Sequence, residues 1–118
     1  MAGYKRADRV NALLQRELGT IISEELNDPR IAFSTVTAVQ VTDDLRSARV
    51  HVSVLGDDDQ ITSTMQALEE AKAYLRREVG DRVALRYVPE LMFVSDRSAE
   101  RSARISSLLR KAKEREQA

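Results

Sequence analysis

The chain has no cysteine and no tryptophan, and only 4% of its 118 residues are aromatic. Without cysteine there are no disulfide bonds, so nothing in the sequence points to an oxidising compartment. The hydrophobic core has to be built mainly from valine, leucine, isoleucine and alanine. No apolar run approaches the roughly 20 residues that cross a bilayer, and no signal-peptide core follows the N-terminus. These absences predict a cytoplasmic protein with no membrane partner.

Neither sign of charge predominates, because 19 basic residues balance 19 acidic ones. The neutral total predicts no particular partner, although one face of a neutral protein can still be strongly positive. A hydrophobic content of 42%, in long periodic stretches, is typical of a folded globular protein. At 118 residues the chain is long enough for one domain and too short for two.

Motifs for catalysis and metal binding are also missing. His51 is the single histidine, and without a second histidine or a cysteine it is interpreted as a surface residue rather than a ligand. Three consecutive acidic residues begin at Asp57, where helix capping explains them better than a cation site. No phosphate-binding glycine loop or nucleophile motif occurs. We therefore expect no enzyme activity, no metal and no cofactor.

The first half of the chain predicts a helix followed by a β-hairpin. Apolar residues at helical spacing run over residues 4–27, and Pro29 ends the helix. Gly19 lies inside this helix, where it costs about 1 kcal/mol relative to alanine, so we expect it to mark a close crossing with another element. Side chains then alternate between the two faces of a strand, with a period of two, in residues 33–42 and 48–54. This alternation predicts two antiparallel strands.

The second half returns to helical spacing in residues 57–79, with Gly80 as a left-handed stop. A third strand is predicted over residues 83–95, with Pro89 at a bulge or an edge position. Residues 98–118 predict a charged terminal helix that docks weakly and frays. This order of elements indicates an α+β domain with its helices on one face of a small sheet.

Basic residues gather where the helices begin and end. Three occupy the N-terminal end of the first helix, where cations oppose the helix dipole. Lys72 falls within the apolar stripe of the second helix, so either its stem extends to the surface or the helix bends there. Arginine and lysine bind phosphate and release counterions from nucleic acid, which makes these cations a candidate RNA-binding ridge. The candidates are Lys5, Arg6, Arg9, Lys72, Arg76, Arg77, Arg82 and Arg86.

Two other interpretations of this pattern stay open. A solvated surface, in which Glu69 and Glu78 pair with nearby cations, would produce the same sequence. The protein could instead be an interaction module that inserts the amphipathic helix of residues 98–118 into a partner's groove. Tyr74 and Tyr87 are the only aromatic residues near the cations of residues 72–86, which favours recognition of RNA backbone and shape over base stacking.

Three stretches of the sequence, in this order and spacing, resemble the ribosome-binding factor A family: "DRVNALLQRELGTIISEELNDPRI", "VTAVQVTDDLRSARVHVSVLG" and "LRREVGDRVALRYVPELMFVSDRS". The resemblance implies a single type II KH-like domain in residues 1–97, with the order α-β-β-α-kink-α-β and helices on one face of a three-stranded mixed sheet. A C-terminal helical extension follows in residues 98–118. The family replaces the KH glycine loop by an Ala-x-Gly kink, which here is Ala71, Lys72 and Ala73. Alanine in place of the glycine predicts a shallower bend.

The resemblance also implies a function in assembly of the small ribosomal subunit. It implies binding to the free 30S subunit and its 16S rRNA, near the 5′-terminal helix and the neck. Late maturation and 16S rRNA processing, especially in the cold, would follow from this contact. The family implies release with the help of an assembly GTPase and a cytoplasmic location. We further expect a monomer, because no long apolar patch indicates an obligate dimer.

Overall fold

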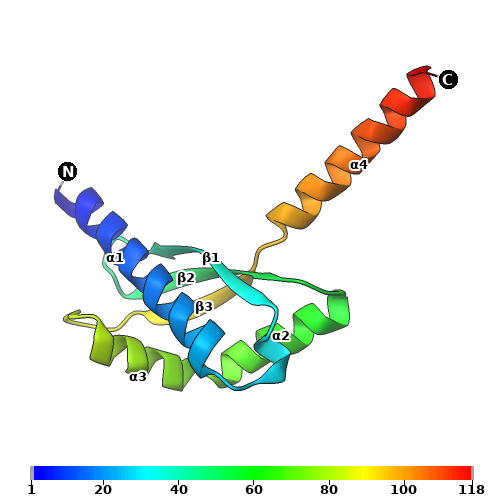
Figure 1. Cartoon of the computed structure of the whole chain (residues 1–118). Coiled ribbons are helices and arrows are strands. Elements are labelled where there is room, and N and C mark those ends of the chain that lie inside the picture. The colour runs from blue at the N-terminus through cyan, green and yellow to red at the C-terminus, as the bar shows by residue number, and fades with distance from the viewer. Residues whose placement is uncertain (1, 118) are drawn as a thin grey trace.

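The computed structural model describes the backbone of residues 2–117 and the side chains of residues 6–97 and 106–115. Three helices pack against a three-stranded sheet and a fourth projects from the body (Figure 1). This α+β arrangement confirms the predicted order of elements. The elements are α1 (Ala2–Thr20), η1 (Ile21–Glu25), η2 (Pro29–Ile31), β1 (Ser34–Val41), β2 (Ser47–Val54), α2 (Asp58–Glu70), α3 (Lys72–Arg82), β3 (Glu90–Ser95) and α4 (Ser98–Gln117).

The sheet is mixed, as predicted. Strand β1 pairs antiparallel with β2, and β2 pairs parallel with β3, so β2 lies in the middle. The register between β1 and β2 shifts between Val36 and Ala38. This bulge changes the face to which the following residues point, so Val36 and Val39 are both buried although they are three positions apart. The simple alternation predicted for residues 33–42 therefore breaks in the middle of the strand.

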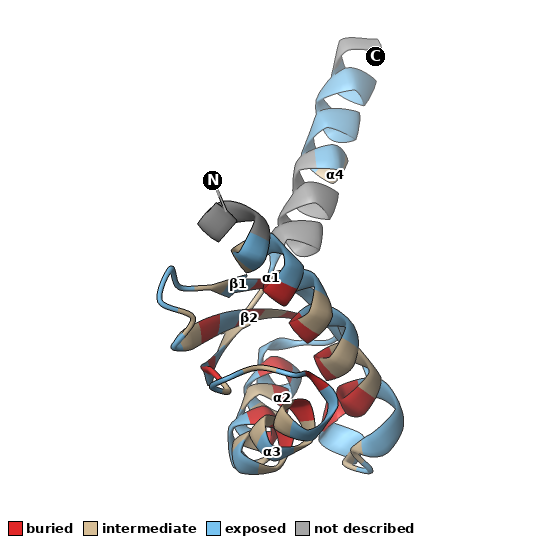
Figure 2. Cartoon of the chain, turned by 90° about the vertical axis from the view of Figure 1, so that its left-hand side faces the viewer, coloured by how far each residue is buried: buried red, intermediate tan, exposed pale blue. Residues whose placement is uncertain are grey.

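One aliphatic core joins the helices to the sheet. Figure 2 shows its residues on the sides of the helices and strands that face one another. Each such side chain contributes about 1.5–3 kcal/mol when it leaves water. The fully buried members include Leu14 and Leu18 of α1, Leu68 of α2, Leu75 and Val79 of α3, Val50 and Val52 of β2, and Leu91 of β3.

The third strand is shorter than the sequence predicts. It begins at Glu90, and residues 83–89 form a loop. The N–H of Val83 donates to the carbonyl oxygen of Val79 over 2.8 Å, which ends α3. The end of the loop that precedes β3 is held by the side chain of Arg76 in α3 rather than by a neighbouring strand. The prediction was wrong because a short alternating apolar run looks the same in a packed loop as in a strand.

Two glycines have other roles than those predicted. Helix α3 continues through Gly80 to Arg82, so Gly80 is not a left-handed stop. Its missing side chain makes room for Val88 instead, because a Cβ there would lie 2.9 Å from Val88 Cγ2. Gly19 has no atom of another element within 4 Å of the place where its Cβ would be, so it marks no close crossing.

Helices α2 and α3 are separated at Ala71, the first residue of the expected kink. Its backbone, at φ −86° and ψ −1°, departs from helical geometry, and its N–H donates to the carbonyl oxygens of Ala67 and Glu69. The next helix starts at once with Lys72. Figure 1 shows the two helices meeting at an angle. Both contribute buried residues to the common core, among them Leu68 of α2 and Leu75 of α3.

Helix α4 extends away from the domain (Figure 1). Within residues 106–115 every side chain except that of Ser107 is exposed, including those of Leu108 and Leu109. The radius of gyration is 17.4 Å, against about 13 Å for a compact chain of this length. The projecting helix accounts for the difference.

Candidate nucleic-acid interface

The eight predicted phosphate-binding cations differ in whether other groups of the domain already bind them. The side chain of Lys5 lies outside the described residues. Lys72, Arg76 and Arg82 are engaged by carboxylates or carbonyl groups of the domain. Within the described part of the chain, four form no ion pair: Arg6, Arg9, Arg77 and Arg86.

Arg76 holds the loop of residues 83–89 against α3. Its guanidinium donates to the carbonyl oxygens of Val88 over 3.1 Å and Pro89 over 3.2 Å. A carboxylate oxygen of Glu90 lies 3.5 Å from the same group. Because the two carbonyl groups occupy two of its donors, Arg76 is in large part a structural residue.

Arg82 connects the end of α3 to η1. One guanidinium nitrogen lies 2.5 Å from the carboxylate of Glu25 and 3.3 Å from that of Glu78. The hydrogen bond from Arg82 holds the pKa of Glu25 below its usual value. The paired carboxylates neutralise this cation, so it offers little charge to an RNA phosphate.

Lys72 keeps its charge at the surface by extending its stem over the apolar edge of the domain. The ammonium lies 2.7 Å from the carboxylate of Glu69 and 6.0 Å from the centre of the Phe93 ring. The side chain retains 29% of its exposure, so the break at Ala71 leaves it half-buried. Of the two outcomes that the sequence allowed, both the bend and the extended stem occur.

Two of the unpaired arginines lie over aromatic rings. The guanidinium carbon of Arg77 is 5.9 Å from the ring centre of Tyr74, and that of Arg86 is 5.7 Å from the ring centre of Tyr87. A ring face attracts a cation without neutralising it. Both guanidinium groups therefore keep their hydrogen-bond donors free for an anion.

Arg6 and Arg86, far apart in the sequence, line the same groove. It has a volume of 330 Å³ and lies where the N-terminal part of α1, the β1–β2 turn and the loop of residues 83–89 meet, at the left in Figure 1. We call it the Tyr87 groove, after the aromatic residue in its lining. Its lining consists of Arg6, Val10, Asp43, Asp44, Leu45, Leu85, Arg86, Tyr87 and Pro89.

The turn that forms one wall of the groove is held by its own hydrogen bonds. The Asp44 carboxylate accepts from the hydroxyl of Thr42 over 2.6 Å and from the N–H of Arg46 over 3.1 Å. These bonds lower the pKa of Asp44. Leu45 takes a left-handed conformation with φ 60°. The carbonyl oxygen of Arg46 accepts from the N–H of Glu90 over 2.8 Å, which ties the turn to β3.

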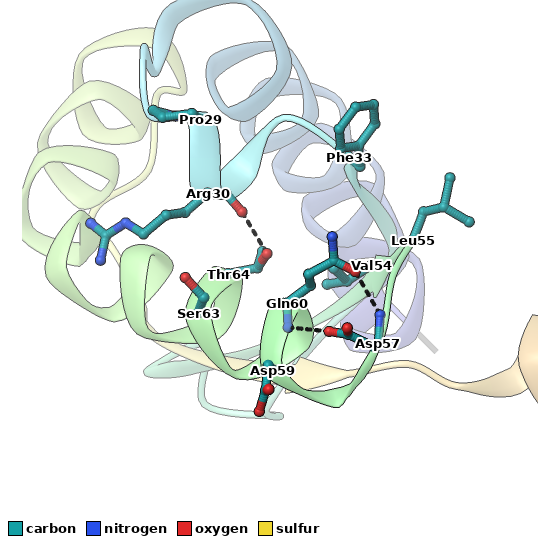
Figure 3. Close-up of a pocket in the computed structure, with 10 residues that line it drawn as sticks. All are labelled: Pro29, Arg30, Phe33, Val54, Leu55, Asp57, Asp59, Gln60, Ser63 and Thr64. Carbon is teal, nitrogen blue, oxygen red and sulfur yellow. Dashed lines mark hydrogen bonds between the residues drawn. The ribbon is translucent and has the colours of Figure 1, made fainter.

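A second groove, of 350 Å³, lies at the other end of the hairpin (Figure 3). Asp57 and Gln60 exchange hydrogen bonds of 2.9 Å and 2.7 Å in a capping box, as expected for one of the three consecutive acids. Phe33 and Leu55 point away from the body beside it and are 70% and 77% exposed. The acidic residues on its rim repel phosphate, so this groove does not suit an RNA backbone.

Among the described residues, no group of three potential ligands is placed to hold a metal ion. His51 is half-buried rather than a surface residue, and its Nε2 has no hydrogen-bond partner there. None of the helices, over the described residues, combines the length and hydrophobicity that crossing a bilayer requires.

The sequence did not predict that Asp43 and Asp44 line the Tyr87 groove, or that Tyr87 is exposed there. Asp43 and Asp44 belong to a polar turn that carried no signal of its own, and their proximity to Arg6 follows only from the packing of α1 on β1. Tyr87 was noted only as one of two nearby aromatic residues. Its 69% exposure depends on the loop that replaces the first part of the predicted strand.

Comparisons with known proteins place the chain beside one family. A family model described as ribosome-binding factor A matches residues 6–109. The ribosome-binding factor A of Halothermothrix orenii is 48% identical over 113 residues, which cover 96% of this chain and 93% of that protein. That of Desulfitobacterium hafniense is 47% identical over 112 residues, covering 95% and 90%.

Solved structures agree with the sequence comparison. The crystal structure of ribosome-binding factor A from Thermus thermophilus superposes with a TM-score of 0.70 and 29% identity, covering 78% of this chain and 98% of that one. A homology model of the Thermus thermophilus factor, fitted into the cryo-EM map of a 30S complex, gives a TM-score of 0.62 and 31% identity. It covers 74% of this chain and 91% of its own.

Proposed function

This chain belongs to the ribosome-binding factor A family, and on that premise we propose that it binds the free 30S ribosomal subunit and acts in ribosome assembly. The related Thermus thermophilus factor, fitted into the map of a 30S complex, supports this proposal. The family match extends over residues 6–109, which include all of the helix–sheet domain except the first residues of α1.

The observation that carries the proposal at the level of residues is the set of arginines without carboxylate partners. Arg6, Arg9, Arg77 and Arg86 keep free guanidinium donors in a chain whose total charge is zero. Arg6 and Arg86 meet at one groove. Guanidinium groups of this kind bind phosphate oxygens and release counterions from RNA.

The finer parts of the function follow from this contact. A domain that holds 16S rRNA near the 5′-terminal helix and the neck would stabilise one RNA conformation and keep an immature subunit out of translation. Processing of 16S rRNA and growth in the cold would depend on it, because misfolded RNA rearranges more slowly at low temperature. The protein itself would need no catalytic residue and no cofactor, would act as a monomer in the cytoplasm, and would leave with the help of an assembly GTPase.

Sedimentation of the tagged protein in cell lysate tests this proposal. We expect co-migration with free 30S subunits and not with whole ribosomes, and loss of that co-migration at high salt. With about four phosphate contacts, log affinity should fall against log salt with a slope near −3 to −4. A protein that stays at the top of the gradient at low salt would contradict the function.

The exposed leucines of α4 favour one additional contact. Leu108 and Leu109 are 59% and 66% exposed on a helix that leaves the domain. An amphipathic helix of this kind fits a groove on a protein partner. Such a contact would be lost when residues 98–118 are deleted and would depend little on salt, which distinguishes it from the phosphate contacts.

A further inference from the structure

The Tyr87 groove combines features that a phosphate contact does not require. A phosphate needs only donors, whereas this groove also has an apolar floor and an exposed aromatic ring. Val10 is 6% exposed and Pro89 is fully buried beneath it, while Tyr87 is 69% exposed at its side. Its volume of 330 Å³ is near the lower limit of about 300 Å³ for small-molecule sites, which suits one base with its sugar.

We propose that the Tyr87 groove binds a single unstacked nucleobase of the RNA, with the base stacked on the Tyr87 ring and the two phosphates that flank its sugar held by Arg6 and Arg86. This inference rests on the proposed function, because the base belongs to an RNA that the protein already binds. Aromatic side chains stack on bases that leave a helix, which is how proteins usually read single-stranded RNA. The sequence alone favoured backbone recognition, so the groove adds a contact that the sequence did not predict.

The groove has basic residues that suit the phosphate of a nucleotide and acidic residues that suit its base. Asp43 has no hydrogen-bond or ion-pair partner within the described residues, whereas the Asp44 carboxylate is used in the turn. A carboxylate only accepts hydrogen bonds, so Asp43 matches the amino group of adenine, cytosine or guanine better than the edge of uracil, whose one N–H lies between two carbonyl oxygens. The same carboxylate repels phosphate, which therefore lies on the side of the arginines.

The position of Arg86 supports the stacking geometry. Its guanidinium carbon lies 5.7 Å from the centre of the Tyr87 ring. A base placed against that ring thus brings its own phosphate within reach of the cation. The groove walls come from three segments that the fold fixes, because Arg76 holds the end of the loop and the Arg46 carbonyl holds the turn.

The test uses the full chain, purified 30S subunits and reagents that probe all four bases. Tyr87→Ala is the test variant, and Tyr87→Phe keeps the ring. Phe33→Ala is the matched control, because Phe33 is as exposed as Tyr87 (70% against 69%) and lies at the opposite end of the hairpin. Thermal unfolding establishes that each variant folds.

We expect Tyr87→Ala to weaken binding roughly 5- to 100-fold and to abolish protection of one unpaired adenine, cytosine or guanine, with the salt slope unchanged. Tyr87→Phe and Phe33→Ala should keep both the affinity and the protection. Equal affinity and equal base protection in Tyr87→Ala and Phe33→Ala would overturn the inference, and a protected uracil would contradict the role given to Asp43. If the unchanged protein fails to bind 30S subunits, the proposed function itself is wrong.

A free nucleotide is the other source of the same chemistry. Titration of the chain with AMP, CMP, GMP and UMP, without subunits, distinguishes a free nucleotide from a base that belongs to RNA. Millimolar or weaker binding agrees with a base that is held as part of an RNA. Micromolar binding of a free nucleotide that Tyr87→Ala abolishes would overturn the RNA assignment, because the groove would then be a small-molecule site.

Discussion

Val88 packs against Gly80 so closely that a Cβ on the glycine would lie 2.9 Å from Val88 Cγ2. This contact joins the loop of residues 83–89 to α3, next to the carbonyl groups that Arg76 holds. The loop carries Arg86 and Tyr87, two residues of the proposed RNA contact. The position of the interface therefore depends on a residue without a side chain.

Gly80→Ala should destabilise the domain, although alanine favours a helix, because the new methyl group forces Val88 and its loop away from α3. We expect the free energy of unfolding to fall by about 1–3 kcal/mol, as for other overpacked sites. Gly19→Ala is the control within a helix, because nothing lies within 4 Å of its Cβ position. Its free energy of unfolding should rise by about 0.5–1 kcal/mol. Urea denaturation measures both, and a stabilised Gly80→Ala protein would disprove the packing argument.

Arg76 and its neighbour Arg77 should respond differently to the same substitution. Arg76→Gln removes hydrogen bonds to two carbonyl groups and should lower stability by about 1–3 kcal/mol. Arg77→Gln removes an exposed group and should stay within about 0.5 kcal/mol of the unchanged protein. In binding to 30S subunits, Arg77→Gln should reduce the salt slope by about one. Equal loss of stability in the two variants would contradict the distinction between them.

The bond between Arg82 and Glu25 predicts a pH dependence of stability. Because Arg82 lowers the pKa of Glu25 in the folded state below the ordinary 4.5, its stabilisation is complete above the unfolded pKa and is lost as pH falls through the folded one. Glu25→Gln should therefore be less stable at pH 7 and should approach the unchanged protein in acid. Denaturation at pH 7 and below pH ~4 measures this.

Glu24→Gln is the control for that experiment, because Glu24 is exposed in the same turn and forms no ion pair within the described residues. Its stability should follow the unchanged protein at each pH. If Glu25→Gln shows the same curve as Glu24→Gln, the link between α3 and η1 contributes nothing that depends on the Glu25 charge.

Deletion of residues 98–118 should leave the domain folded. The described side chains of α4 are almost all exposed, and the core lies entirely within residues 10–91. We expect the midpoint of thermal unfolding to change by only a few degrees, since roughly 1 kcal/mol corresponds to 4–8 °C in a domain of this size. Loss of the folded state on truncation would show that the domain boundary at residue 97 is wrong.

The sequence predicted the order of elements because hydrophobic periodicity reports which face of each segment is buried. The stripe on α1 and the alternation on β2 survive folding, whereas the alternation on β1 breaks at the bulge after Val36. The break at Ala71 came from the family resemblance rather than from the pattern. The loop of residues 83–89 was mistaken for a strand because its apolar side chains pack although its backbone forms no ladder.

The partners of the cations lay beyond sequence reasoning for a physical reason. Arg82 and Glu25 are far apart in the chain and meet only when α3 packs beside η1. Arg76 finds carbonyl groups, which every residue possesses and no sequence pattern marks. Only contacts between residues three or four positions apart, such as Lys72 with Glu69, follow from spacing. The separation of structural from free arginines therefore needed coordinates.

The salt dependence of 30S binding by the Arg6→Gln, Arg86→Gln double variant tests the central claim most directly. Its control is Arg16→Gln, which removes an exposed arginine from the same helix as Arg6. If the free arginines of the Tyr87 groove neutralise two phosphates, the double variant should bind more weakly, with a slope less steep by about 1.4–1.8 than that of the control. A double variant with the affinity and slope of Arg16→Gln would show that RNA does not reach this end of the molecule.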